Sequence, residues 1–158
     1  MNEHNENHLD GLGGAAHLII TNSDHVRDSE RILLFTGAKC WGPFAEKKKF
    51  PFNCDDWLKD GDKPVNNLEV ICMEGSKTPG ELAILIDNTT LVTGDIIRAH
   101  EGGRLCMLPD EKLQNRELAV NSIKRIAAIK SIEAVITGDG WPIFKNGHDA
   151  LVELSEKL

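Results

Sequence analysis

Charged and polar side chains follow several apolar segments of the chain, and they are of types that can support binding or catalysis. A carboxylate can bind a cation, transfer a proton or pair with a basic group, and an imidazole can bind metal or transfer protons. The candidates for one shared pocket are Asn22, Asp24, His25, Arg27, Asp28, Ser76, Lys77, Asp95, Arg98, His100 and Asp139. What they can do depends on the elements that position them.

The segment from Thr78 to Asp95 organises the rest of the chain. Pro79-Gly80 predicts a tight turn, because proline presets φ and glycine permits a positive φ. An apolar strand, a polar turn over residues 87–90 and a second apolar strand follow. The polar turn suits a hairpin, because its side chains can bond their own backbone. Asp95 is therefore predicted at a strand end, where functional side chains gather.

Strands and helices alternate along the remaining sequence. The patterns predict strands over 17–21, 38–41, 68–74 and 133–137, helices after 22–24, from 109–110 and within 146–158, and loops over 55–64, 96–103 and 138–142. The first two strands are expected to run parallel through a right-handed crossover. Asn22, Ser23 and Asp24 are good helix N-cap residues, which accounts for Asp24 without any chemistry. The alternation indicates an α/β fold with a parallel part joined to the antiparallel hairpin.

Three segments of the sequence resemble the metallo-β-lactamase fold superfamily, in the family's order. Residues 78–95 resemble its central hairpin, in which a His-Thr-Pro-Gly turn leads to strands ending in Thr-Gly-Asp. Residues 18–28 resemble the strand and loop of its Thr-His-x-His-x-Asp-His signature, and residues 136–140 resemble the loop of its last metal-binding histidine. The resemblance implies an α/β (α+β) αββα sandwich. Much of the N-terminal β layer is expected to be missing, because the polar lead over residues 1–12 has no strand pattern.

The metal-binding positions depart from the family pattern. Aligned without gaps, they fall on Asn22, Asp24, Val26, Arg27, Lys77, Asp95 and Asp139. Only Asp95 keeps the family residue, and no histidine remains at these positions. A gapped alignment puts the family's Asp-His pair on Asp24-His25 and rescues one imidazole, but it shortens the loop by two residues. We prefer the ungapped alignment.

The resemblance implies that Asp24, Asp95 and Asp139 meet in one pocket. Three close carboxylates cannot all stay ionised without compensation. They can bind a hard cation such as Mg²⁺, Mn²⁺ or Ca²⁺, pair with basic side chains, or keep one carboxyl protonated. The basic candidates are Arg27, Lys77 and Arg98. We rank the ion-paired pocket without metal first, because a protonated lysine repels a cation and has no lone pair to offer.

The sequence therefore predicts a divergent family member with a degenerate metal site, which is non-catalytic or binds a small molecule or partner, and needs no cofactor. The alternative is a hydrolase of an ester, thioester or phosphoester that uses Mn, Mg or Zn on Asp24, Asp95 and Asp139, since a bound metal activates water in this family. His100 is the remaining imidazole best placed for the pocket, because its loop follows Asp95. Exposed sheet edges left by the missing layer favour a homo-oligomer.

Composition limits the class of protein. The 158 residues, 41% of them hydrophobic, suffice for one domain over residues 13–158. The formal net charge of −7 argues against nonspecific binding of nucleic acid. No segment has the pattern of a membrane span or a signal peptide. Four widely spaced cysteines favour reduced thiols in a cytoplasmic protein over a disulfide or zinc framework.

Overall fold

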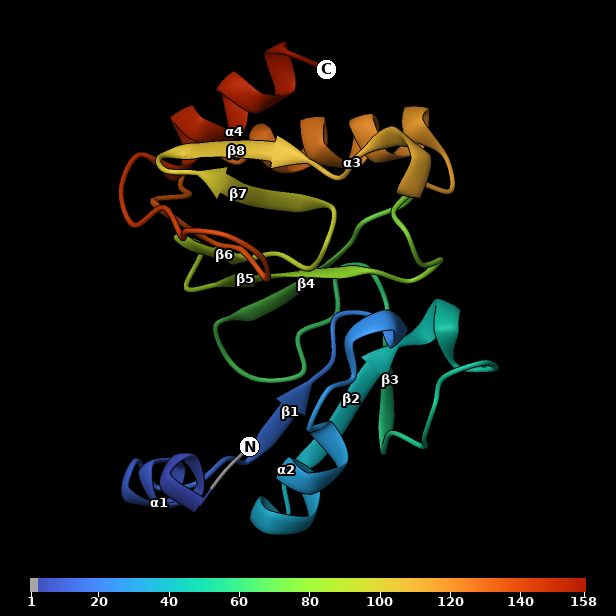
Figure 1. Ribbon diagram of the computed structural model, residues 1–158, viewed down its shortest axis with the longest axis vertical. Coiled ribbons are helices and arrows are strands. Elements are labelled where there is room, and N and C mark those ends of the chain that lie inside the picture. Colours follow the sequence, from blue (N-terminus) through green and yellow to red (C-terminus); the bar gives the residue numbers. More distant parts are fainter. Residues whose placement is uncertain (1–2) are drawn as a thin grey trace.

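The molecule combines α-helices with three β-sheets, and a computed structural model describes it over residues 3–158 (Figure 1). The strands are β1 (His17–Ile19), β2 (Lys39–Pro43), β3 (Asp56–Leu58), β4 (Leu68–Cys72), β5 (Leu82–Ile86), β6 (Thr90–Val92), β7 (Ile97–Glu101), β8 (Arg104–Met107) and β9 (Ala134–Ile136). The helices are α1 (Glu3–Gly11), α2 (Ser29–Thr36), α3 (Arg116–Ala127) and α4 (Gly147–Glu156), with short 3-10 turns η1 (Ser23–His25), η2 (Phe44–Glu46) and η3 (Asp110–Lys112). The mixed architecture confirms the predicted α/β class.

The N-terminal sheet has the order β1-β2-β3, and both strand pairs are parallel. The predicted parallel pairing of the first two strands is confirmed, and Gly37, with φ of 66°, ends α2 in the left-handed conformation that glycine adopts without strain. The prediction of a loop over 55–64 is wrong in part, because β3 lies inside it. One large apolar residue, Trp57, between charged neighbours is too short a pattern to indicate a strand.

The central sheet has the order β4-β5-β6-β9 and contains the predicted hairpin. β5 and β6 pair antiparallel, and the turn residues Asp87 and Asn88 both have positive φ, 51° and 60°. Two successive left-handed residues define the turn whose twist matches a two-stranded hairpin. β9 then adds to β6 in parallel, so the end of β6 lies beside the end of β9.

A second hairpin, β7-β8, occupies the segment that the sequence analysis predicted as a loop over 96–103. Ile97 and Ala99 are buried while Arg98 is half-buried and His100 exposed, so the strand alternates between inside and outside. The charged residues and the Gly102-Gly103 turn hide this alternation in a five-residue stretch. The correction matters for the site, because Arg98 and His100 now have fixed directions on a strand.

Two hydrophobic clusters hold the layers together. On β4 and β5, Val70, Leu82 and Ile84 pack with Trp41 and Leu58 of the N-terminal sheet in the smaller cluster. Their neighbours along the same strands face the other way and join the larger cluster, which includes buried residues of α3 and α4. Since alternate strand residues face opposite sides of a sheet, the central sheet lies between the N-terminal sheet and these two helices. Figure 1 shows α1 and α2 at the opposite end of the molecule from α3 and α4.

The polar lead is helical, which the sequence analysis did not predict. Residues 3–11 form α1, none of whose residues is buried, and the carboxylate of Glu6 contacts the guanidinium of Arg31 on α2 at 2.7 Å. The first two residues of the predicted lead, Met1 and Asn2, lie outside the described part of the chain. Within residues 3–158 no helix is both long and apolar enough to traverse a bilayer. All four cysteines are free thiols, with the sulfur atoms of Cys40 and Cys54 3.0 Å apart.

Candidate functional site

The buried side of the site forms where β6 ends. Thr93 donates its backbone N–H to the carbonyl oxygen of Ile136 at 2.9 Å, which joins the ends of β6 and β9. The chain then turns through Gly94 and places Asp95 in a buried position, with 6% of its surface exposed. Asp95 therefore lies at a strand end, as predicted.

A second buried carboxylate, Glu81, supports this corner. Its Oε1 accepts the backbone N–H of Ile96 at 2.8 Å, and its Oε2 accepts the hydroxyl of the fully buried Ser76 at 2.5 Å. Burial raises the pKa of Glu81 to about 7, against the lowering effect of these two hydrogen bonds. The sequence analysis included Ser76 but missed Glu81. A charged residue directly before the fully apolar strand β5 was the available signal.

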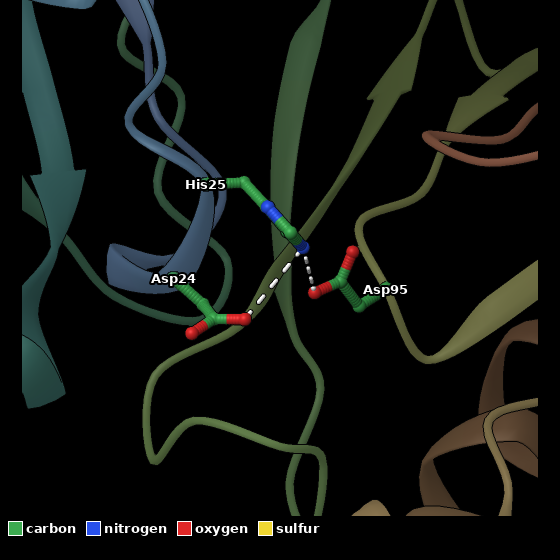
Figure 2. Close-up of side chains that lie close together, drawn as sticks. All are labelled: Asp24, His25 and Asp95. Carbon is green, nitrogen blue, oxygen red and sulfur yellow. Dashed lines mark ion pairs between the residues drawn. The ribbon is translucent and has the colours of Figure 1, made fainter.

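The segment after β1 brings a histidine to Asp95. The carbonyl oxygen of Thr21 accepts the backbone N–H of Leu82 at 2.8 Å, and the buried Asn22 caps η1 by accepting the N–H of Asp24 at 3.0 Å. The 3-10 turn then aims His25 inward. Its Nε2 lies 3.0 Å from Oδ2 of Asp95 and 3.6 Å from Oδ2 of Asp24, so the imidazole lies between two carboxylates (Figure 2).

Lys77 neutralises Asp24, the more exposed carboxylate of this group. Its ammonium donates a hydrogen bond to Oδ2 of Asp24, the same oxygen that faces His25. The hydrogen bond from Lys77 lowers the pKa of Asp24. Burial opposes this effect, and the electrostatic interactions of Asp24 with Lys77 and His25 lower the pKa further. Gln114 fixes the backbone at this point, because its side-chain amide donates to the carbonyl oxygen of Lys77 at 3.2 Å.

The loop after β9 forms a separate charged group. Oδ2 of Asp139 lies 3.3 Å from Nε2 of His100 and 3.7 Å from a guanidinium nitrogen of Arg98. Two backbone hydrogen bonds hold this loop against β7, from the N–H of Ala99 to the carbonyl oxygen of Asp139 at 3.0 Å and from the N–H of Trp141 to the carbonyl oxygen of Ala99 at 2.7 Å. The structure thus brings Asp139 together with Arg98 and His100.

Two predicted site residues, Arg27 and Asp28, lie on the segment between η1 and α2. Arg27 is exposed and has a positive φ of 44°, two residues after the end of η1. Asp28 is the N-cap residue of α2, although its side chain makes no capping hydrogen bond. The helix-start chemistry that the sequence offered for Asn22 is real, since Asn22 caps η1.

Asp24, His25 and Asp95 could together hold one metal ion. Within the described residues, they are the one group of three or more acidic, histidine or cysteine side chains whose ligand atoms all lie within 4.8 Å of one another. The alternative from the sequence named Asp139 as the third ligand, whereas the structure has His25 in that role. This is the imidazole that the gapped alignment keeps, so the geometry favours the gapped alignment over the ungapped one at this loop.

The donor set fits a single cation. Two ligand atoms of one metal lie about 3.0–3.4 Å apart when both metal–ligand distances are about 2.1 Å at octahedral or tetrahedral angles. The 3.0 and 3.6 Å separations around His25 Nε2 are close to this range. Oδ2 of Asp95 is buried and, despite its contact with His25, receives no well-aligned hydrogen bond from the described residues. Three ligands, one of them engaged by Lys77, do not suffice for two metals.

Known proteins resemble the chain in sequence family and in fold. A family model described as "Metallo-beta-lactamase superfamily" matches residues 1–158. The protein TTHA1623, solved in a di-iron-bound form, aligns with a TM-score of 0.71 and 15% identity over 90% of this chain and 79% of that one. The archaeal superfamily protein ST1585 from Sulfolobus tokodaii aligns with a TM-score of 0.71 and 15% identity over 94% and 69% of the two chains.

A metallo-β-lactamase from Pontibacter korlensis aligns with a TM-score of 0.71 and 12% identity, over 99% of this chain and 77% of that one. No curated protein matches by sequence. At such identities the similar structures establish the fold, and the activity has to be argued from the site itself.

Proposed function

Because the chain belongs to the metallo-β-lactamase superfamily and yet pairs a lysine with Asp24, we propose that it is a divergent member with a degenerate metal site. In this proposal the charged side chains beside Asp95 bind a small molecule, and the protein does not act as a two-metal hydrolase. The observation that carries the proposal is the hydrogen bond from Lys77 to Oδ2 of Asp24.

The charges of the pocket support this function. Asp24 is paired with Lys77, Asp95 with His25, and Asp139 with Arg98 and His100, so each of the three carboxylates named for a cation has a basic or imidazole neighbour. Lys77 occupies the turn position at which the sequence resemblance puts a metal-binding histidine. An ammonium there satisfies the carboxylate and repels a second cation.

The side chains also offer a ligand suitable contacts. The side chains of Lys77 and His25 are both about one-third to two-fifths exposed, at 34% and 41%, and therefore reach solvent beside the buried Asp95. Partly exposed donors beside a buried, rigid acceptor can bind a polar molecule with little rearrangement. Ligand binding would then replace water at Lys77 and His25 and leave the buried hydrogen bonds of Glu81 unchanged.

A second candidate function follows from the unsatisfied Oδ2 of Asp95. In this alternative, one divalent cation is held by His25, Asp95 and Asp24, and the protein is a hydrolase of an ester, thioester or phosphoester. A bound cation would supply Lewis acidity and an activated water. The chain's own part would be to move Lys77 off Asp24 so that both carboxylates face the cation.

Metal analysis of the purified protein separates the two functions. We expect far less than one equivalent of Mn, Zn or Fe per chain, and no change in melting temperature on adding Mn²⁺, Mg²⁺, Zn²⁺ or EDTA. A near-stoichiometric metal that EDTA removes with a fall in melting temperature would contradict the metal-free pocket, because an ion bound only to the folded state stabilises it.

The variant Lys77→Met tests the role of the lysine directly. Without the ammonium, Asp24 is free to bind a cation, so we expect Mn²⁺ to raise the melting temperature of the variant but not of the native protein. A cation at about 100 times its dissociation constant adds about 2.7 kcal/mol. Lys63→Met, which removes the exposed pair with Glu69, is the matched control and should show no response. Equal responses in native protein and variant would show that Lys77 does not oppose metal.

A further inference from the structure

A cavity of about 430 Å³ lies next to the candidate site, and the proposed function makes no use of it. Ser23, which precedes Asp24, and Pro79, two residues after Lys77, are among its lining residues. Its other lining residues include Glu46, Lys48, Lys49 and Gln114. The cavity therefore combines one acid with two of the lysines that the sequence places in a basic run.

Glu46 is a buried carboxylate with an unmet hydrogen-bonding need. Its residue surface is 3% exposed, and its Oε2 accepts the backbone N–H of Ser23 at 2.9 Å. Its Oε1 is buried and has no hydrogen-bond partner, and Glu46 forms no ion pair, among residues 3–158. A buried carboxylate with one hydrogen bond is unfavourable, and such a group in a native protein requires an explanation.

The fold holds the Glu46 carboxylate in place. A Cβ at Gly80 would lie 2.7 Å from Cγ and 3.1 Å from Oε1 of Glu46, so the glycine of the tight turn makes room for this side chain. By contrast, both oxygens of the nearby Glu81 are hydrogen-bonded within the protein. Of these two buried glutamates, Glu46 is the one that keeps an oxygen without a hydrogen-bond partner among the described residues.

The rim of the cavity has the opposite charge. Lys48 and Lys49 are exposed, and neither forms an ion pair within the described part of the chain. An acid inside and two ammonium groups at the rim complement a ligand that carries a positive group and a negative group. A protonated amine forms a strong hydrogen bond to a carboxylate that is shielded from water. Lysine side chains bind carboxylate or phosphate groups as point charges.

We propose that this cavity binds a small zwitterion, whose protonated amine pairs with the carboxylate of Glu46 and whose anionic group contacts Lys48 and Lys49. The inference goes beyond the proposed function and does not depend on whether a metal binds at Asp95. Because Ser23 directly precedes Asp24, such a ligand would lie near the charged side chains of the candidate site.

Titration of the full chain with four probes tests the inference. L-leucine and phosphoethanolamine each carry a positive amine and a negative group, which is a carboxylate in the first and a phosphate in the second. Isoamylamine carries only the positive charge, and isovalerate only the negative charge. We expect saturable binding of at least one zwitterion by calorimetry or NMR below about 10 mM, and binding of each single-charge analogue about tenfold weaker or more. Absence of zwitterion binding up to that concentration would overturn the proposal, and so would single-charge analogues that bind equally well.

Two variants assign the binding to this cavity. Glu46→Gln keeps the shape but loses the negative charge, and should weaken the zwitterion about tenfold or more at an unchanged melting temperature. Should that variant fold poorly, the surface double variant Lys48→Ala/Lys49→Ala should weaken the zwitterion with the affinity for the amine unaltered. Lys63→Met, which removes an exposed pair with Glu69 and does not line this cavity, should bind as the native protein does. Native-like affinity in both cavity variants would refute the inference.

Discussion

The inner and the outer side of the candidate site hold similar charges in different surroundings. On the inner side, Glu81 and Asp95 are 0% and 6% exposed, and Glu81 is hydrogen-bonded at both oxygens. On the outer side, the Asp139 side chain is 48% exposed and contacts Arg98 and His100 at 3.7 and 3.3 Å. Charge interactions strengthen as water is excluded and weaken where water screens them. The comparison indicates that inner charges influence stability strongly, while the outer loop depends on its backbone.

The largest effect is expected where the outer loop meets β7 through backbone atoms. A Cβ at Gly140 would lie 2.1 Å from the carbonyl oxygen of Ala99, and the residue has a φ of 97° that alanine adopts only with strain. We expect Gly140→Ala to lower the free energy of unfolding by about 2–4 kcal/mol. Urea denaturation measures this change.

Gly102→Ala is the control for that substitution. Gly102 lies in the neighbouring β7-β8 turn with open space around its Cβ position, so alanine there should change stability by less than about 0.5 kcal/mol. Equal effects of the two substitutions would mean that the close backbone approach does not hold the outer loop, and the comparison would fail.

The second effect concerns Glu81 and pH. Burial raises its pKa from 4.5 to about 7 in the folded protein, so the folded state holds a proton that the unfolded state has lost between these values. The contribution of neutral Glu81 to stability is complete below pH 4.5 and is lost as the pH rises toward about 7. The total loss is about 3 kcal/mol, at about 1.4 kcal/mol for each unit of pKa difference.

Urea denaturation of the native protein and of Glu81→Gln at several pH values isolates this contribution. The difference in stability between the two proteins should shift by about 3 kcal/mol in favour of the variant from pH 4.5 to 7.5. A difference that stays constant with pH would show that the buried glutamate does not titrate, and would remove the main energetic contrast between the two sides.

Asp24 is expected to show a smaller effect of opposite sign. Lys77 lowers its folded pKa below the ordinary value of 3.8, so its contribution to stability is present above that value and is lost as pH falls through the lower folded pKa. Because about a third of the side chain is exposed, the contribution at neutral pH is less than about 1 kcal/mol.

The stability of Asp24→Asn, compared with the native protein at pH 7 and at pH 3, measures this contribution. The variant should be slightly less stable at pH 7, and the two proteins should approach each other at the lower pH. A variant that is more stable than the native protein at neutral pH would show that Lys77 does not compensate the carboxylate.

The smallest effect is expected at the outer carboxylate. Asp139→Asn removes two screened ion pairs and keeps the backbone hydrogen bonds of the loop, so the free energy of unfolding should change by less than about 0.5 kcal/mol. Thermal unfolding at low and moderate salt tests this. A fall of more than about 1 kcal/mol in the free energy of unfolding would show that Asp139 contributes to stability in the way expected of the buried charges.

The sequence predicted those parts of the fold that strong local signals encode. Asp87-Asn88 indicated a hairpin because both residues tolerate positive φ, and Asp95 followed the second strand as expected. The parallel pairing of β1 and β2 followed from a strand, a helix ended by Gly37 and a second strand. The β7-β8 hairpin was missed, because Arg98, His100 and Glu101 make the alternation of Ile97 and Ala99 look like a loop.

The site was harder to predict, because it depends on register and burial. The two alignments of the loop after β1 differ by two residues. The sequence alone did not show that His25, one of the predicted site residues, lies 3.0 Å from Asp95. Glu81 and Glu46 differ from surface glutamates only in their burial, which tertiary packing determines. Asp24, Lys77 and Asp95 were identified because they align with metal-binding positions of the family's sequence motifs.

The division of the apolar residues into two clusters has a consequence for the motions of the molecule. Asp24 and His25 follow a sheet anchored through Trp41 and Leu58, whereas Asp95 precedes Ile96 in the larger cluster. Residues 17–58 can therefore open as a unit at lower free energy than global unfolding, and their amide protons should exchange faster. A molecule bound across His25 and Asp95 would slow that exchange throughout the unit, including at amides it never touches.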